Sequence, residues 1–527
     1  MWAISRDPCD ENVIRSAPAR STCSKSQGRW ILAATILASS MAFIDGTVVN
    51  VALPALQTNL NASAIDVQWV VEAYALLLSA FLLVGGSLGD HYGRRRIFLI
   101  GITIFAIASA GCGVALNIAQ LIAARAFQGF GAALLVPGSL AIISSSFSEQ
   151  ERGRAIGTWS AFSAITTGIG PVLGGWLIEH VSWRAVFFIN LPIALLVLLI
   201  SLRHVTETAE RDRDQIDWLG AVLAVLGLGA LVYGLIESSR FGFENGVVMS
   251  ALVIGSLLLV LFVVVELRSS HPMLPFALFR SPIFTGTNLL TLLLYAALGG
   301  TLFFLPLNLI QVQHYSPTAA GAALLPFILL MSLLSRWSGG LVTRYGSKLP
   351  LVVGPLIAAT GYALFTLPSV GGSYWTTFFP AIIALGLGMT ISVAPLTTTV
   401  MNSVPQNRVG VASGVNNAVA RTAGLIAIAV FGIVMLEVFG SALDRHLKEA
   451  KFPRAIIDSV RAQSTKLAAM EFPPNADSAM RQRIHAAIDN SFVSGFRSVM
   501  LIGAVLATAS AVTSLIFIAA PKRRKSA

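Results

Sequence analysis

The amino-acid sequence predicts an all-α integral membrane protein with about fourteen transmembrane helices. Of its 527 residues, 55% are hydrophobic and only 12% are charged, and the mean hydropathy is +0.76. A soluble globular protein carries about 25% charged residues. A chain this long with so few charges cannot cover the surfaces of several soluble domains, whereas a surface that faces lipid accounts for the composition.

Uncharged segments follow one another along the chain after its first 29 residues. A transmembrane helix needs about 20 mostly apolar residues to cross roughly 30 Å of hydrocarbon. Ten segments each account for one span: Ile31–Ile44, Ala73–Gly89, Ile97–Ala124, Ala126–Ser148, Ala155–Ile178, Ala185–Leu202, Trp218–Ile236, Asn245–Val265, Val409–Leu436 (interrupted by Arg421) and Ser498–Ala520. Two longer segments, Ser281–Ser335 and Leu349–Asn407, each hold two spans, because Tyr315-Ser316-Pro317 and Gly371-Gly372-Ser373 are turn signals.

The placement of Lys and Arg predicts which side of the membrane each loop faces. These residues gather in the N-terminal tail 1–29, in every second loop and in the basic tail 521–527. Because cytoplasmic loops are enriched in Lys and Arg, we expect both termini on the cytoplasmic side of the cell inner (plasma) membrane. The outer loop 438–495 is long enough to cross regardless of charge. Its stretches Leu443–Met470 and Ser478–Phe496 are expected to form amphipathic helices that lie on the outer face.

The composition and the motifs exclude several classes of function. The formal net charge is +11, from 36 Lys and Arg against 25 Asp and Glu, but the basic residues are dispersed at membrane edges and form no patch for nucleic acid. No GxxxxGK[ST] motif is present, which excludes ATP hydrolysis at a P-loop. Three scattered cysteines and seven histidines that are well separated in the sequence predict no metal site. We expect no cofactor and no enzymatic activity.

An internal repeat divides the chain into two halves. GSLGDHYGRRR (86–96) and GGLVTRYGSK (339–348) share their Gly, Leu, Tyr and Gly positions, while Thr343 stands in the second copy where Asp90 stands in the first. The copies are eight spans apart, although two equal six-helix halves would place them six spans apart. We therefore predict two six-helix halves, 30–203 and 281–520, and a linker, 204–280, that carries two inserted transmembrane helices.

Together these motifs and several others resemble one family of transporters. The Gly-x-Leu-x-Asp-x-x-Gly-Arg-Arg pattern of the first repeat is similar to a loop signature of the major facilitator superfamily. Five further segments resemble its fourteen-helix drug:proton antiporter branch, the QacA/EmrB type: FIDGTVVNVALP (43–54), QWVVEAY (68–74), LIAARAFQGFGAALLVP (121–137), GIGPVLGG (168–175) and WRAVFFINLP (183–192). The resemblance extends over about residues 30–520 and implies the major facilitator fold. Thr166 departs from it, because the family pattern usually has a glycine there.

Three ionisable residues fall inside predicted spans of the first half. Asp45, Glu72 and Arg125 each lie roughly 6–9 Å below the outer boundary, at about 1.5 Å per residue. Charge inside a bilayer is costly and usually functional, and two carboxylates beside one guanidinium can form a site that takes up and releases a proton. The resemblance implies proton coupling for Asp45 and Arg125 and contact with cationic drugs for Glu72. The alternative is a static ion pair that only helps the helices associate.

Two glycine-containing motifs are candidate parts of the transport cycle. Gly86, Asp90, Gly93 and Arg94 are expected to form a charge latch between the halves, or else only an anchor with a tight turn at Gly93. The antiporter motif, Gly170, Pro171, Gly174 and Gly175, places small residues where helix backbones can approach closely. The resemblance suggests a leak-resistant contact with the other half, and ordinary helix packing is the alternative.

Arg421 is a buried charge of the second half and a candidate substrate-binding residue. It could meet an anionic substrate group or a distant carboxylate, or it could hold the fold through backbone carbonyls.

These observations predict a proton-coupled multidrug efflux antiporter that exports amphiphilic, mainly cationic, compounds across the cytoplasmic membrane. One alternative is a dedicated exporter of a single endogenous metabolite or antibiotic. An alternative from another class is a non-transporting membrane receptor or scaffold. The expected partners are a small-molecule substrate, protons and the lipid bilayer, without nucleic acid. The sequence leaves open a membrane-fusion or outer-membrane partner.

Overall fold

The computed structural model describes residues 25–208, 217–270, 272–405, 408–471 and 477–518, and these ranges are helical without a β-strand. Twelve of the described helices or helix pairs are long and apolar enough to cross a membrane. The helix α15 (Lys348–Leu364) is shorter, and α6 (Glu149–His180) carries more charge at its start. If α6 and α15 are added to the twelve, the helices follow the order predicted for about fourteen spans. That these two helices cross the membrane stays a prediction. The expected tails lie outside the described residues, except that α2 already begins at Lys25.

The helices form two groups that lie side by side. The first group is α2 (Lys25–Leu60), α3 (Ala64–Tyr92), α4 (Arg94–Val114), α5 (Ile118–Ser146), α6, α7 (Ala185–Phe188) and α8 (Asn190–His204). The second group is α11 (Pro282–Leu307), α12 (Pro317–Ala323), α13 (Leu325–Gly339), α14 (Leu341–Tyr345), α15, α16 (Tyr374–Asn402), α17 (Val409–Glu449), α18 (Arg454–Arg461) and α19 (Ser478–Phe517). Three short helices, η1 (Phe276–Arg280), η2 (Asn308–Val312) and η4 (Ser464–Ala469), lie in the connections between successive longer helices.

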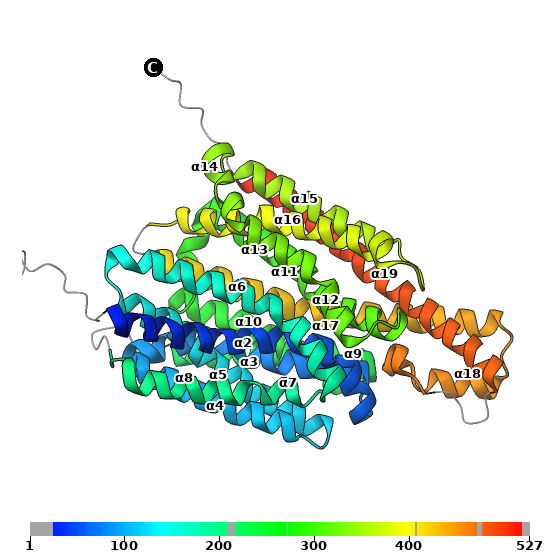
Figure 1. Cartoon of the computed structure of the whole chain (residues 1–527). Helices are drawn as coiled ribbons and strands as arrows, with labels where there is room; N and C mark the ends of the chain where they lie inside the picture. The colour runs from blue at the N-terminus through cyan, green and yellow to red at the C-terminus, as the bar shows by residue number, and fades with distance from the viewer. Residues whose placement is uncertain (1–24, 209–216, 271, 406–407, 472–476, 519–527) are drawn as a thin grey trace, which may run out of the picture.

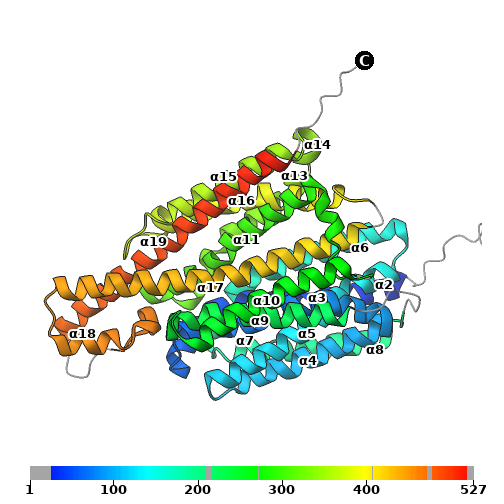
Figure 2. The ribbon, with the colours of Figure 1, turned by 180° about the vertical axis from the view of Figure 1, so that it is seen from behind.

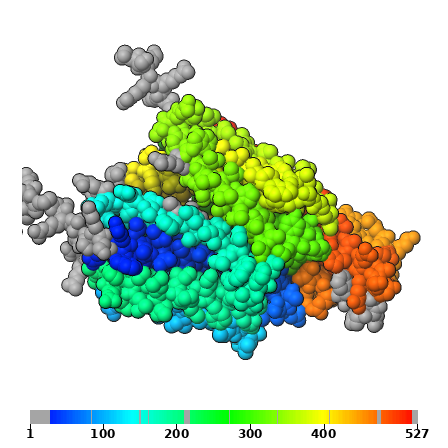
Figure 3. Space-filling model, in the orientation of Figure 1, coloured from blue at the N-terminus to red at the C-terminus, as the bar shows by residue number. Residues whose placement is uncertain are grey.

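The two groups meet at one end of the molecule. Their ribbons converge towards the end that carries α18 and diverge towards the end that carries α14 (Figures 1 and 2). Helix α6 packs on α12 and α13, and α3 packs on α17. In the space-filling view the surface of α6 meets that of α12 and α13 directly (Figure 3). We call these two ends of the molecule the α18 end and the α14 end.

The inserted helices α9 (Trp218–Phe241) and α10 (Gly246–Arg268) form a pair beside the seam between the groups. Helix α9 contacts α3 of the first group and α17 of the second. Trp69 Nε1 donates a 2.8 Å hydrogen bond to Glu237 Oε1, which fixes α9 to α3. Helix α10 buries only Val248, Gly255 and Glu266, so its long apolar surface is suited to face lipid.

Glycines allow several helix pairs to approach backbone to backbone. A Cβ on Gly129 of α5 would overlap the carbonyl of Tyr74 on α3, and one on Gly388 of α16 would overlap the backbone of Ala358 on α15. Where hydrocarbon surrounds the helices, such close packing is a main source of association energy. The two copies of the sequence repeat also fold alike. In each copy a glycine with positive φ stands just before the next helix: Gly93 (φ 109°) before α4, and Gly346 (φ 75°) before α15.

The loop predicted after the thirteenth span differs from the expectation. Leu443–Met470 and Ser478–Phe496 were expected as separate helices on the membrane surface, but α17 runs unbroken to Glu449 and α19 runs unbroken from Ser478. With 41 and 40 residues, these helices are about 60 Å long at 1.5 Å per residue. The hydrocarbon core of a bilayer is about 30 Å thick, which is about half of that length. The loop is therefore a protrusion made of two extended spans, closed by α18 and η4 (Figure 1).

We expect Gly129→Val to lower the apparent melting temperature of the purified protein in detergent. The added side chain would overlap the Tyr74 carbonyl, and overpacking of this kind costs about 1–3 kcal/mol. Gly153→Ala is the matched control, because a Cβ at Gly153 meets nothing within 4 Å. Equal melting temperatures for the Gly129 variant and the wild type would contradict the close approach of α3 and α5.

Candidate functional site

A buried ion pair lies inside the first group of helices. Asp45 of α2 is 0% exposed and Arg125 of α5 is 1% exposed. Arg125 Nη1 donates to Asp45 Oδ2. The other oxygen, Oδ1, accepts from Gln128 Nε2 at 2.8 Å and from Asn190 Nδ2 at 3.3 Å. The carboxylate thus has three donors from two other helices, as a buried charge requires.

The guanidinium of Arg125 is held on several sides. Its Nε donates to the Val70 carbonyl of α3 at 3.1 Å, and Nη1 also contacts Gln128 Oε1 at 2.8 Å. The Tyr74 ring lies 4.1 Å from the guanidinium carbon, a cation–π distance. Because α5 turns once in 3.6 residues, Arg125 and Gln128 share the face of α5 that points to Asp45. The site therefore joins side chains of α2, α3, α5 and α8.

Asn190 extends this network into α4. Its Nδ2 donates to Ser109 Oγ at 3.1 Å, and Ser109 Oγ donates to the Phe187 carbonyl at 2.8 Å. Gln128, Asn190, Ser109 and Tyr74 were not identified as site residues from the sequence. Two signals were available: Gln128 lies one turn after Arg125, and Asn190 lies within the WRAVFFINLP motif.

Glu72 is buried but lies outside this network. It is 0% exposed, and neither carboxylate oxygen has a hydrogen-bond partner among the described residues. One turn before it, Gln68 Nε2 donates to the Ile428 carbonyl of α17 at 3.0 Å, so this face of α3 is turned to the second group. The predicted cluster of two carboxylates and one guanidinium is thus split. Asp45 lies in the interior of α2, which continues past Pro54 to Leu60.

Arg421 approaches the ion pair from the other group of helices. It lies on α17 within electrostatic range of Tyr74, which also feels the charges of Asp45 and Arg125. Tyr74 O–H donates to the Ala42 carbonyl of α2 at 3.2 Å. The Tyr74 ring thus contacts the guanidinium of its own group, and Arg421 of the opposite group lies in its vicinity.

The residues of the predicted latch lie where α3 meets α4: Gly86 and Asp90 in the last turns of α3, Gly93 between the helices and Arg94 at the start of α4. Asp90 and Arg94 form an ion pair at 2.8 Å, four residues apart. Gly93 adopts φ 109°, and a Cβ there would clash with the Glu207 carboxylate. That carboxylate accepts from the backbone N–H groups of Arg95 (3.1 Å) and Arg96 (3.0 Å). Glu207 thus caps the first turn of α4 with negative charge, which the helix dipole favours, and sequence reasoning missed it.

The glycines of the antiporter motif face two different neighbours. Added Cβ atoms at Gly170 and Gly174 would meet Thr47 and Val48 of α2, in the same group. One at Gly175 would overlap the backbone of Pro317 on α12, in the other group. In return, a Cβ on Gly321 of α12 would overlap the Pro171 carbonyl of α6. Of the glycines named in these four contacts, Gly175 and Gly321 bring the two groups into backbone contact.

Polar contacts join the groups at the α18 end. Gln311 Nε2 donates to Gln57 Oε1 at 2.7 Å, and Lys466 Nζ of η4 donates to Asn61 Oδ1 at 2.6 Å. Glu179 Oε2 accepts from the backbone N–H of Thr318, at the start of α12, at 3.3 Å. These bonds must break if the groups separate here.

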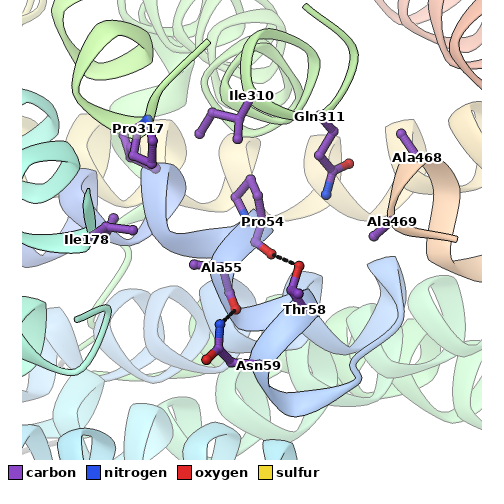
Figure 4. A pocket seen from close by; sticks show the side chains of 11 residues that line it. Pro54, Ala55, Thr58, Asn59, Ile178, Ile310, Gln311, Pro317, Ala468 and Ala469 are labelled. Atoms are coloured by element: carbon purple, nitrogen blue, oxygen red, sulfur yellow. Dashed lines mark hydrogen bonds between the residues drawn. The ribbon is translucent and has the colours of Figure 1, made fainter. Parts of the chain in front are cut away.

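A pocket of about 390 Å³ lies between the groups near these contacts. Pro54, Thr58 and Asn59 of α2 line one wall, and Ile178 of α6 and residues of η2, α12 and η4 line the rest (Figure 4). All of its α2 residues lie past Asp45 towards the α18 end, so the pocket is separate from the buried ion pair.

Two histidines that the sequence places far apart come together in space. His314, in the turn after η2, and His485 of α19 have ring centroids 5.3 Å apart. The expectation from sequence of well-separated histidines therefore does not hold for this pair.

A bundle of apolar helices in two groups, with charged residues buried inside it, is the architecture of a multi-pass membrane transporter. Residues 35–428 match the model of the Major Facilitator Superfamily. The chain belongs to this superfamily, so it is a transporter of small molecules rather than an enzyme.

Similar proteins support this assignment over most of the chain. The Multidrug resistance protein Stp of Mycobacterium tuberculosis is 35% identical over 425 residues, which cover 80% of this chain and 78% of that protein. The Tetracenomycin C resistance and export protein of Streptomyces glaucescens is 33% identical over 511 residues, 95% of this chain and 94% of that protein. A bacterial homolog of the human lysosomal transporter Spinster has the same fold, with a TM-score of 0.67 at 19% identity, covering 95% of this chain and 100% of that one.

We expect a strong energetic coupling between Asp45 and Arg125. Asp45→Asn or Arg125→Gln alone leaves a buried charge without its partner, which costs about 3–5 kcal/mol. The double variant should lose about 1–3 kcal/mol less than the sum of the two, measured from thermal unfolding in detergent. The partly exposed pair Arg240–Asp66, with a separation of 2.7 Å, is the control and should show a coupling below about 1 kcal/mol. Additive effects at Asp45 and Arg125 would contradict the ion pair.

Proposed function

We propose that this transporter is a proton-coupled efflux antiporter that exports amphiphilic, mainly cationic, drugs or toxic compounds. The observation that carries this proposal is the Asp45–Arg125 pair, which is buried inside the first group of helices. The names of the two relatives support export of drugs as the direction and class of transport. The membrane is the inner membrane, with the Arg-rich α14 end in the cytoplasm and the α18 end outside, as the loop charges favour.

The proton acts on the Asp45–Arg125 pair. When Asp45 is ionised, its charge is balanced by Arg125 and the carboxylate accepts three hydrogen bonds. Protonation removes that balance and leaves the guanidinium buried without a counter-ion, at a cost of about 3–5 kcal/mol. A free energy of about 5.5 kcal/mol shifts a two-state equilibrium from 1:99 to 99:1. One proton on Asp45 can therefore supply most of the energy needed to change which state of the transporter is favoured.

The motion is a rocking of the two groups about the seam. Backbone contact between α6 and α12, at Gly175 and Gly321, closes the α18 end tightly. The Asp90–Arg94 pair and the cap from Glu207 keep the turn between α3 and α4 rigid. In our proposal Asp90 and Arg94 exchange this local contact for one with the second group when the α14 end closes.

Glu72 and Arg421 bind the substrate. Glu72 is a buried carboxyl group whose oxygens have no hydrogen-bond partner among the described residues, on a face of α3 turned to the second group. An unsatisfied buried acceptor costs about 1–3 kcal/mol, so a cationic or hydrogen-bond-donating ligand that reaches it recovers that energy. Arg421, from the opposite group, favours substrates that also carry an acceptor or an anionic group.

A dedicated exporter of one antibiotic is the second candidate function. The Tetracenomycin C resistance and export protein matches 95% of this chain, and its name describes a single compound. A receptor or scaffold without transport is disfavoured, because such a protein gains nothing from a costly buried charge. The range of compounds that move protons separates these functions.

We expect wild-type protein in inverted vesicles to dissipate an imposed pH gradient when a transported compound is added. Asp45→Asn should slow this proton movement at least tenfold, because the carboxylate that takes up the proton is lost. Glu244→Gln, at an exposed loop residue, should behave like the wild type. The measurement is fluorescence of a pH indicator with a panel of cationic, neutral and anionic amphiphiles. Proton movement in Asp45→Asn at the wild-type rate would rule out Asp45 as the coupling site, and activity with one compound alone would favour the dedicated exporter.

We expect Glu72→Gln to separate substrates by charge. Loss of the carboxylate should raise the KM for cationic compounds at least tenfold and leave that for neutral ones within about twofold, because only the cations use its charge. The same vesicle assay with concentration series measures both. An equal effect on cationic and neutral compounds would show that Glu72 supports the fold or the proton step instead.

A further inference from the structure

Three potential metal ligands gather on the protrusion side of the second group, away from the buried ion pair. His314 lies in the turn between η2 and α12, and His485 and Asp489 lie one turn apart on α19. Their ligating atoms are all within 4.8 Å of one another. From this geometry we propose that His314, His485 and Asp489 form a binding site for a divalent transition-metal ion of the zinc type.

The chemistry of the three groups suits zinc. Imidazole nitrogens and carboxylate oxygens bind Zn²⁺ at about 2.0–2.2 Å, and sites with three protein ligands keep a further position for water. His485 Nδ1 and Asp489 Oδ2 are 2.8 Å apart, near the spacing of two ligands on one ion at such bond lengths. The His314 ring stands at 62° to the His485 ring. To complete the site, the His314 ring must approach the other two ligands, which an exposed side chain in a turn can do.

The carboxylate itself points to a missing ligand. Asp489 is 5% exposed, and its Oδ1 has no hydrogen-bond partner among the described residues. A buried acceptor of this kind is normally satisfied. A metal ion shared with the two histidines satisfies it and places positive charge beside a buried negative one.

A cationic side chain on the same helix is directed away from the three ligands. The nearby Arg483 of α19 is directed elsewhere, since its Nη2 donates to the Ala450 carbonyl and its guanidinium lies 4.9 Å from the Phe452 ring centroid. The two histidines reach the surface, so the ion can enter from solvent. His314 has φ 57°, a backbone conformation in which His is enriched over most residues, and the turn continues directly into α12.

A metal ion would connect two parts of the chain that have separate roles. His314 is three residues from Pro317, where α12 touches Gly175 of α6 at the seam. His485 and Asp489 belong to the extended part of α19. The bound ion therefore ties the start of α12 to the protrusion.

Titration of the purified full-length protein with Co²⁺ tests this proposal. Co²⁺ replaces Zn²⁺ in sites with nitrogen and oxygen ligands and absorbs visible light when it is bound, so occupancy is read directly. The protein is purified through a tag without histidine. We expect about one Co²⁺ per chain, displaced by Zn²⁺, with at least tenfold weaker binding in His314→Gln and in Asp489→Asn. His180→Gln changes an exposed histidine that stacks on Trp176, and it should bind like the wild type.

Two results would overturn the proposal. One is the absence of saturable Co²⁺ and Zn²⁺ binding by the wild type. The other is binding that His314→Gln leaves unchanged, or that His180→Gln weakens equally, because the ligands would then lie elsewhere. The melting temperature without metal shows whether each variant is folded. His314 is exposed, so His314→Gln should keep the wild-type value and remain informative even if Asp489→Asn is unstable.

Discussion

The pairing of Asp45 with Arg125 imposes a demand that the surrounding helices must meet. A carboxylate and a guanidinium in an apolar interior need their charges balanced and their hydrogen bonds completed together. Here α2 supplies the acid and α5 the base, while Gln128, Asn190 and the Val70 carbonyl complete the bonds. These groups can meet only if α3 and α5 approach at backbone distance, which Gly129 permits. The glycine-rich character of the first group is thus connected to the charge that it encloses.

The sequence predicted the level at which charged side chains lie along the helices better than the side of the helix to which each one points. Buried charges and uncharged runs place Asp45 and Arg125 at matching levels, and the structure joins them. Glu72 was expected in the same cluster because it lies near that level. However, each residue turns a helix by about 100°, so Glu72 points about 200° away from Val70, whose carbonyl contacts Arg125. The level of a side chain follows from counting residues along its helix. Which side of the helix packs on a neighbouring helix depends on the tertiary fold.

Other differences have equally physical reasons. Gln128 and Asn190 are neutral, so they carry none of the cost that makes a buried charge conspicuous in a sequence. Hydropathy falls where α17 leaves the lipid, yet the helix continues to Glu449 because backbone hydrogen bonds do not depend on the surroundings of the side chains. His314 and His485 are separated by most of the second group in sequence, and only the folded chain brings them together.

The inserted helices have a structural relation to both groups. Helix α9 touches α3 and α17, and Trp69 is bonded to Glu237 near its end. Helix α10 lies beyond it with most of its side chains exposed. The pair thus covers the seam on the side where α3 and α17 meet, and it does not cover the side where α6 meets α12.

Helices α17 and α19 leave the membrane without a break, and this continuity has a mechanical meaning. A rod about 60 Å long that turns by about 10° moves its far end by about 10 Å relative to its near end. If the second group rotates, the tip formed by α18 is therefore displaced much further than the near ends of the two helices. Conversely, a protein or ion that binds the tip acts far from the near ends of the helices, so a small force there is enough to resist such a rotation.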